Sequence, residues 1–141
     1  MPPALAVAAL LLAMAGCGFG PGQRIKQPVL TGPAIQEVLA GNTLHGRTAA
    51  GAAIDLYYRP DGTVFAAGRE RSGVAFADRG RWSVEDDRIC TRFQAIRGRV
   101  KLCEWVTQSG EDLRTYEPLG RPSASGVIEP GDSRGLDAGA G

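Results

Sequence analysis

The feature that most constrains the fold is a series of short segments in which apolar and polar residues alternate, each followed by turn-forming residues. Residues 54–58 show this pattern, and Pro60, Asp61 and Gly62 then favour a turn, because proline presets φ and glycine accepts a positive φ. Such segments recur at roughly 8–12 residue spacing, which is typical of an antiparallel meander or a small barrel. About seven or eight strands are expected, at residues 43–48, 54–58, 63–67, 73–77, 81–85, 88–93, 100–106 and 113–117.

One short helix is expected ahead of these strands. Thr31 is a suitable N-cap, and Pro33 fits the first turn because its missing N–H has no partner there. Ile35, Val38 and Leu39 form one apolar stripe, which a helix this short must pack against other elements. The expected fold class is therefore mostly β (α+β), with one short N-terminal helix packed on an antiparallel meander or small barrel.

Composition divides the chain into parts of different character. Residues 18–31 are rich in glycine, proline and glutamine, which indicates an extended tether. Gly, Pro, Ser and Ala account for 14 of the 23 residues in 119–141, too few apolar side chains to offset the entropy of ordering. The expected parts are a signal peptide (1–16), a lipid-anchored tether (17–32), a single β-rich domain (33–118) and a disordered tail (119–141).

An uninterrupted apolar run at residues 4–15 indicates a targeting segment. It is shorter than the roughly 20 residues that span a bilayer as a helix, and it has the length of a signal-peptide core. Ala13, Met14 and Ala15 match the small-x-small pattern of ordinary signal removal. Met14-Ala15-Gly16-Cys17 resembles the lipobox of bacterial lipoproteins, in which the cysteine is lipidated and becomes the new N-terminus. Both cleavage patterns remain open at this point.

The three cysteines favour lipidation over plain secretion. An exported chain with three cysteines has one left over after pairing, and lipidation of Cys17 leaves Cys90 and Cys103 as an even pair. These two lie on neighbouring expected strands, where a disulfide would contribute about 3 kcal/mol. The alternative is a metal site, but two cysteines and the distant His45 do not provide four ligands at a standard spacing. A disulfide and no metal site are therefore expected.

A lipid on Cys17 would place the chain in the bacterial cell envelope, facing the periplasm, with the membrane as its first partner. Gly18 after the cysteine resembles the sorting pattern for the outer membrane, not for retention at the inner one. A net charge of +1 excludes strong electrostatic capture of nucleic acid.

The polar residues indicate no catalytic set and no cofactor. His45 is the single imidazole, and no nucleophile-elbow pattern accompanies it. Residues 85–87 are acidic, but they fall between two expected strands, where aspartate is a turn former. The basic run at residues 97–101 is interpreted as a solvated turn, with binding to an anionic lipid headgroup or to a partner carboxylate as the alternative. The chain is therefore not expected to be an enzyme.

Four aromatic residues on the expected strands have two interpretations. The first is core packing, because aromatic side chains bury large areas in small domains. The second is a lined pocket open at one end, as some small barrels have. The residues are Tyr57, Tyr58, Trp82 and Trp105.

An ordered set of short motifs resembles a group of small uncharacterised exported bacterial domains that are common in alphaproteobacteria. The set is Leu39-x-Gly41-Asn42-Thr43, Tyr57-Tyr58-x-x-Asp61-Gly62, Gly80-x-Trp82, Cys90 and Cys103. The resemblance implies an exported lipoprotein module of the α+β or β-rich class with a disulfide. Gly80-Arg81-Trp82 also resembles the Gly-x-Trp of lipocalin-like barrels and their relatives that inhibit bacterial metalloproteases.

Two hypotheses of function follow. The first is a non-enzymatic envelope lipoprotein that binds a protein or an envelope component. The alternative is a small-ligand-binding or protease-inhibitor barrel of the lipocalin-like type. A closed barrel with an apolar cavity above about 300 Å³ favours the alternative, and a filled interior with an exposed apolar patch favours the first.

Overall fold

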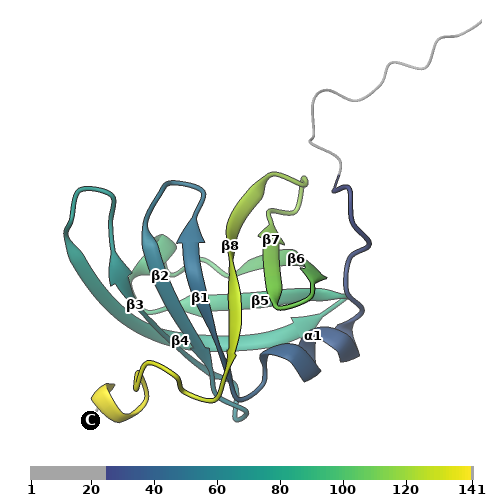
Figure 1. Ribbon diagram of the computed structural model, residues 1–141. Coiled ribbons are helices and arrows are strands. Elements are labelled where there is room, and N and C mark those ends of the chain that lie inside the picture. Colours follow the sequence, from purple (N-terminus) through teal and green to yellow (C-terminus); the bar gives the residue numbers. More distant parts are fainter. Residues whose placement is uncertain (1–24, 141) are drawn as a thin grey trace, which may run out of the picture.

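The computed structural model describes residues 25–140 and contains one α-helix followed by eight strands (Figure 1). The expected signal peptide and Cys17 lie outside the described residues. None of the described helices is long and apolar enough to cross a bilayer. The elements are α1 (Gly32–Leu39), β1 (Asn42–Thr48), β2 (Ala53–Tyr58), β3 (Thr63–Arg69), β4 (Ala75–Glu85), β5 (Arg88–Phe93), the 3₁₀ turn η1 (Ile96–Arg99), β6 (Leu102–Ser109), β7 (Asp112–Tyr116), β8 (Pro122–Pro130) and a second 3₁₀ turn η2 (Ala138–Ala140).

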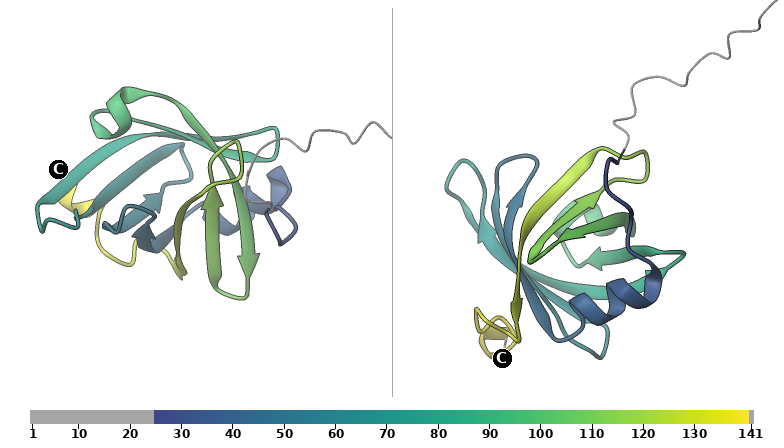
Figure 2. Two further views of the ribbon diagram at one scale, coloured as in Figure 1. Left: turned by 90° about the horizontal axis from the view of Figure 1, so that it is seen from above. Right: turned by 45° about the vertical axis from the view of Figure 1, so that its right-hand side comes forward.

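The eight strands form a closed antiparallel barrel. Each strand pairs with the next one along the chain, and β8 returns to pair with β1 from Asn42–Pro130 to Thr48–Ala124. The views in Figure 2 show the strands wrapping around a common interior. The predicted fold class is confirmed, and the sheet takes the barrel form.

The prediction of a disordered tail is wrong, because β8 lies within residues 119–141. This strand is hydrogen-bonded on both sides, to β1 and to β7. Backbone pairing on both edges orders a segment that has few apolar side chains of its own. Beyond β8, the Gly131 carbonyl accepts a hydrogen bond from the Thr43 hydroxyl at 2.7 Å, and Asp137 pairs with Arg59 at 3.0 Å. The domain therefore continues well past residue 118.

The N-terminal boundary of the domain lies earlier in the chain than predicted. The predicted tether extends to residue 32, but the Leu30 N–H donates to the Val106 carbonyl at 2.8 Å, and α1 begins at Gly32. Two predicted strands, 73–77 and 81–85, are one continuous strand, β4. The predicted and observed numbers of strands still agree, because two predicted strands merge into β4 and the unpredicted β8 replaces the one that is lost.

Two glycines lie opposite each other where the barrel closes. Gly46 of β1 is paired with Gly126 of β8. A Cβ atom at Gly46 would lie 2.0 Å from the Ser125 carbonyl oxygen, and one at Gly126 would lie 2.3 Å from the His45 carbonyl oxygen. Since real Cβ atoms do not approach backbone this closely, only glycine allows β1 and β8 to meet here.

Helix α1 lies at the end of the barrel where β1 begins. Its buried Ile35 and Leu39 belong to the same core cluster as Leu44, Val106 and Leu113. The Gly32 N–H donates to the Asp87 carboxylate at 2.6 Å, which fixes the start of α1 to the β4–β5 turn. The apolar stripe of the helix thus packs into one end of the barrel. Figure 1 shows the helix beside β4 and β5.

Candidate functional site

The barrel interior is hollow toward the end opposite α1. The cavity has a volume of about 520 Å³. Every second residue of β2 points into it, as the alternation of the strand requires. Most of the wall is apolar, and its largest side chains are Leu44, Ile54, Leu56, Phe76, Ile89 and Phe93.

Three connections border the mouth of the cavity. Ala50 lies in the β1–β2 loop, Ser72 lies in the β3–β4 loop, and Ile96 lies in η1 between β5 and β6. Ala50 and Ser72 are exposed to solvent as well as to the cavity, so the hollow reaches the surface between these loops. The arrangement is a cup, closed by the α1 end and open at the loops.

The four aromatic residues singled out in the sequence lie in three different environments, namely the cavity, the core and the outer face of the barrel. Tyr58 is buried and lines the cavity, and its ring meets that of Trp82 edge to face with centroids 5.5 Å apart. Trp82 is a core residue whose indole N–H donates to the Arg59 carbonyl at 2.8 Å. Tyr57 and Trp105 lie on the outer face, where Tyr57 stacks on Phe65 and Trp105 lies under the Arg88 guanidinium. One of the four thus lines the pocket.

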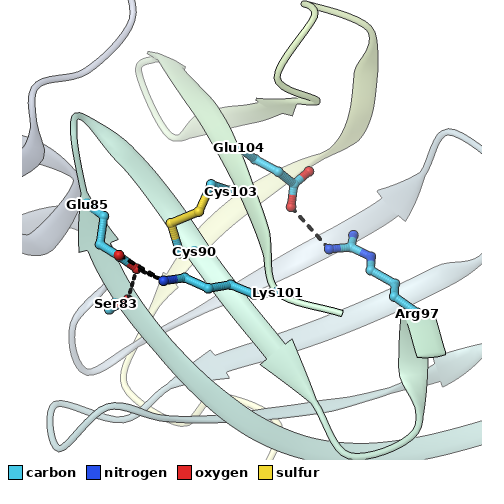
Figure 3. Close-up of a disulfide and its surroundings, with 7 residues drawn as sticks. All are labelled: Ser83, Glu85, Cys90, Arg97, Lys101, Cys103 and Glu104. Carbon is cyan, nitrogen blue, oxygen red and sulfur yellow. Dashed lines mark hydrogen bonds and ion pairs between the residues drawn. A yellow bond between two sulfur atoms is a disulfide. The ribbon is translucent and has the colours of Figure 1, made fainter. Parts of the chain in front are cut away.

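Of the carboxylates that line the cavity in the described part of the chain, Glu104 is the buried one. Glu104 of β6 is buried, and its Oε1 atom lies 3.3 Å from Nη1 of Arg97 (Figure 3). The Ser123 hydroxyl donates to the other oxygen, and Ser123 and Thr115 share a hydrogen bond of 2.7 Å. A buried carboxylate in an apolar space needs such partners, because desolvation penalises its charge.

Arg97 reaches the cavity because of the conformation of η1. Its φ is 58°, in the left-handed region that non-glycine residues rarely adopt, and Gly98 follows with φ 60°. The Asp78 carboxylate holds the segment by accepting hydrogen bonds from the Ala95 and Ile96 N–H groups, both at 2.8 Å. Burial alone would raise the pKa of Asp78, but these N–H donors lower it below its ordinary value.

The interpretation of residues 97–101 as a solvated turn therefore needs correction at Arg97. Its side chain lines the cavity and pairs with Glu104. Lys101 pairs with Glu85 on the outside of the barrel, and the Arg99 side chain donates to the Gln94 carbonyl. The segment is held by specific contacts along its length.

Two hydroxyl groups inside the cavity have no hydrogen-bond partner among residues 25–140. Tyr58 is 3% exposed and Thr91 is 7% exposed, and both line the cavity. Burial raises the pKa of Tyr58, the negative charge of Glu104 raises it further, and Arg97 opposes the shift. The Tyr58 hydroxyl therefore stays protonated and can donate a hydrogen bond to a bound molecule.

The predicted disulfide between Cys90 and Cys103 is confirmed. The two residues are directly opposite each other on β5 and β6 (Figure 3). The bridge therefore joins the two strands that carry η1 between them. The Glu85 carboxylate lies close to both sulfur atoms, but sulfurs bonded to each other are not the thiolates that bind a metal.

His45 lies on the outer face of β1, away from the cavity. Its Nδ1 atom is 2.5 Å from the Asp55 carboxylate, and its side chain is half exposed. The imidazole and the cavity thus lie on opposite faces of the sheet.

The cavity combines a concave apolar wall with a few convergent polar groups. This combination is typical of sites that bind small molecules. Comparison of the chain with protein families, curated proteins and solved structures finds no match.

Proposed function

We propose that this protein binds a small amphipathic molecule inside its barrel. The observation that carries the proposal is the cavity of about 520 Å³ within a closed sheet. Ligand pockets measure roughly 300–1,000 Å³, whereas ordinary protein interiors leave few voids larger than a water molecule. The apolar wall suits the body of the ligand, and the group around Glu104 suits its polar end.

The role is binding without catalysis. The buried polar groups of the cavity are Tyr58, Thr91, Glu104 and Thr115. They can hold and orient a molecule, and the imidazole of His45 is on the other face of the sheet. This proposal follows the second of the two hypotheses drawn from the sequence, in its ligand-binding form.

A second candidate is the binding of a protein or an envelope component. It is favoured by exposed apolar side chains in three loops near the mouth. Val74 is 59% exposed, Val100 is 63% exposed and Leu119 is 89% exposed. Large apolar side chains exposed on loops are available to a docking partner.

We also propose that the chain is exported and anchored in the cell envelope by a lipid on Cys17. The apolar run at residues 4–15 and the lipobox-like residues that follow support this location. The Cys90–Cys103 disulfide supports it too, because disulfides persist in oxidising compartments. The test is the intact mass of protein extracted from membranes: a chain that begins at Cys17 with added acyl mass is expected. A chain that begins at Gly16 without acyl mass would contradict the anchor.

The ligand-binding proposal can be tested with an apolar fluorescent probe such as N-phenyl-naphthylamine. Ala52 lines the cavity, and its neighbour Ala53 is exposed on the outer face. Ala52→Trp should fill the mouth and weaken probe binding about tenfold or more, a loss of about 1.4 kcal/mol. Ala53→Trp is the matched control and should bind as the wild type does. Equal binding by both variants would contradict the proposal, and so would a wild-type protein that shows no saturable binding.

A further inference from the structure

We propose that the polar end of the ligand is uncharged and carries a hydrogen-bonding oxygen, as in a long-chain alcohol or a monoacylglycerol, and that the cavity selects against the corresponding carboxylate. The inference rests on the proposed function and specifies the class of molecule that the cavity takes. It follows from the charges that face the cavity and from the hydroxyl groups that lack partners there.

The cavity already holds a balanced pair of charges. The Glu104 side chain is 7% exposed, and Arg97 is the cation that contacts it. At the mouth, Glu70 and Arg71 are both exposed to water and opposite in sign. An uncharged ligand leaves this balance unchanged.

A carboxylate entering the cavity would add a second negative charge beside Glu104. It would either share Arg97 with Glu104 or draw Arg97 away. Removing the partner of a buried charge is strongly unfavourable, because the remaining charge is left desolvated and unpaired. The Arg97–Glu104 pair therefore makes the cavity a poor site for an anion, although it contains an arginine.

The hydroxyl groups favour a neutral oxygen. Tyr58 and Thr91 have no partner among the described residues, and their hydroxyl oxygens are open to the cavity, where a bound molecule can reach them. A ligand hydroxyl can accept a hydrogen bond from Tyr58 and can itself donate. Glu104 is an available acceptor, since a carboxylate has about four lone-pair sites and Arg97 and Ser123 occupy two.

The test compares lauryl alcohol with laurate at neutral pH, on delipidated protein and below the aggregation limit of either ligand. Displacement of the fluorescent probe gives both affinities. In the wild type, laurate should bind about tenfold or more weakly than lauryl alcohol. Tyr58→Phe should weaken lauryl alcohol about threefold to tenfold, because it removes one hydrogen bond.

Glu104→Gln is the decisive variant. It keeps the shape of the side chain and frees the charge of Arg97, so laurate should gain about tenfold while lauryl alcohol changes little. Glu85→Gln removes a carboxylate from the outside of the barrel, where Glu85 pairs with Lys101, and should match the wild type for both ligands. Melting curves check that each variant is folded.

The outcomes separate the two proposals. If wild-type protein binds laurate as tightly as lauryl alcohol, the inference is wrong and the ligand-binding function stands. If Glu104→Gln is folded and laurate gains nothing, the charge argument is wrong. If neither ligand nor the apolar probe binds, the proposed function is wrong and the inference falls with it. If Glu104→Gln does not fold, the ratio of the wild-type affinities for lauryl alcohol and laurate still tests the inference.

Discussion

Arg97 and Glu104 form an ion pair inside the mouth of the barrel, with Nη1 of the arginine 3.3 Å from Oε1 of the glutamate. The glutamate comes from β6 and the arginine from η1, a turn with left-handed backbone at Arg97 and Gly98. The pair joins a strained connection to the wall of the cavity, and stability and binding should both depend on it.

Breaking the pair from one side should destabilise the protein. Arg97→Gln leaves the buried Glu104 carboxylate without its cation, and the free energy of unfolding should fall by about 1–2 kcal/mol. The figure is modest because Arg97 is 37% exposed and water can replace part of its contact. The double variant Arg97→Gln/Glu104→Gln should recover most of the loss. Urea denaturation of the single and double variants measures this, and additive losses would show that the two side chains do not interact.

Protonation of Asp78 should account for part of the stability that the protein loses in acid. Its pKa is lower in the folded state than in the unfolded chain, so its stabilising contribution is present above the unfolded value and is lost as the pH falls toward the folded value. Asp78→Asn should therefore be less stable than the wild type at neutral pH and should lose less stability on acidification. Asp112→Asn, on the exposed side of β7, is the control. Unfolding curves between neutral and strongly acidic pH test this, and parallel pH profiles for Asp78→Asn and wild type would refute it.

Loss of the disulfide should destabilise the β5–β6 pair and the η1 segment that it encloses. The two cysteines are 13 residues apart, and a loop of this size contributes about 3 kcal/mol in the chain-entropy model. The variant Cys90→Ala/Cys103→Ala should unfold at correspondingly lower urea and should no longer respond to a reductant. The wild type should fall to a similar stability when reduced. If the stability of the wild type does not change when a reductant is added, the bridge is absent or contributes little.

A methyl group at the barrel seam should be poorly tolerated. Gly46→Ala places a Cβ atom 2.0 Å from the Ser125 carbonyl oxygen, so the β1–β8 pairing must shift, at a cost of about 1–3 kcal/mol or more. Gly139→Ala is the control, since no heavy atom lies within 4 Å of a Cβ at that position. Thermal melts should show a clear loss for the first variant and almost none for the second. Equal melting temperatures for Gly46→Ala and Gly139→Ala would mean that the β1–β8 pairing accommodates a Cβ atom at Gly46.

Much of the barrel could be predicted from local sequence pattern. The segment 88–93 matches β5, and 54–58 differs from β2 by one residue at its start, because alternation and turn residues are local signals. Strand β8 carries little such signal. Its inward positions are Ala124, Gly126 and Ile128, and the strand is ordered by hydrogen bonds to partners distant in sequence.

The candidate site was less predictable than the fold. The spacing of Cys90 and Cys103 predicted their bridge, and Tyr58 was singled out as a core or pocket residue. The sequence does contain a signal for Glu104, which is a charged residue at an inward position between Leu102 and Val106 of an alternating strand. The size of the cavity has no local signature, because it depends on how eight strands close and on the side-chain volume left inside.

The most direct test of the account is an NMR titration of the protein with lauryl alcohol, observed at the methyl groups. Binding inside the barrel predicts saturable shifts for Leu44, Ile54 and Leu56, which line the cavity, and none for Val127, which is exposed on the outside. Shifts confined to exposed methyl groups, or no saturable shift at all, would contradict a ligand-binding interior.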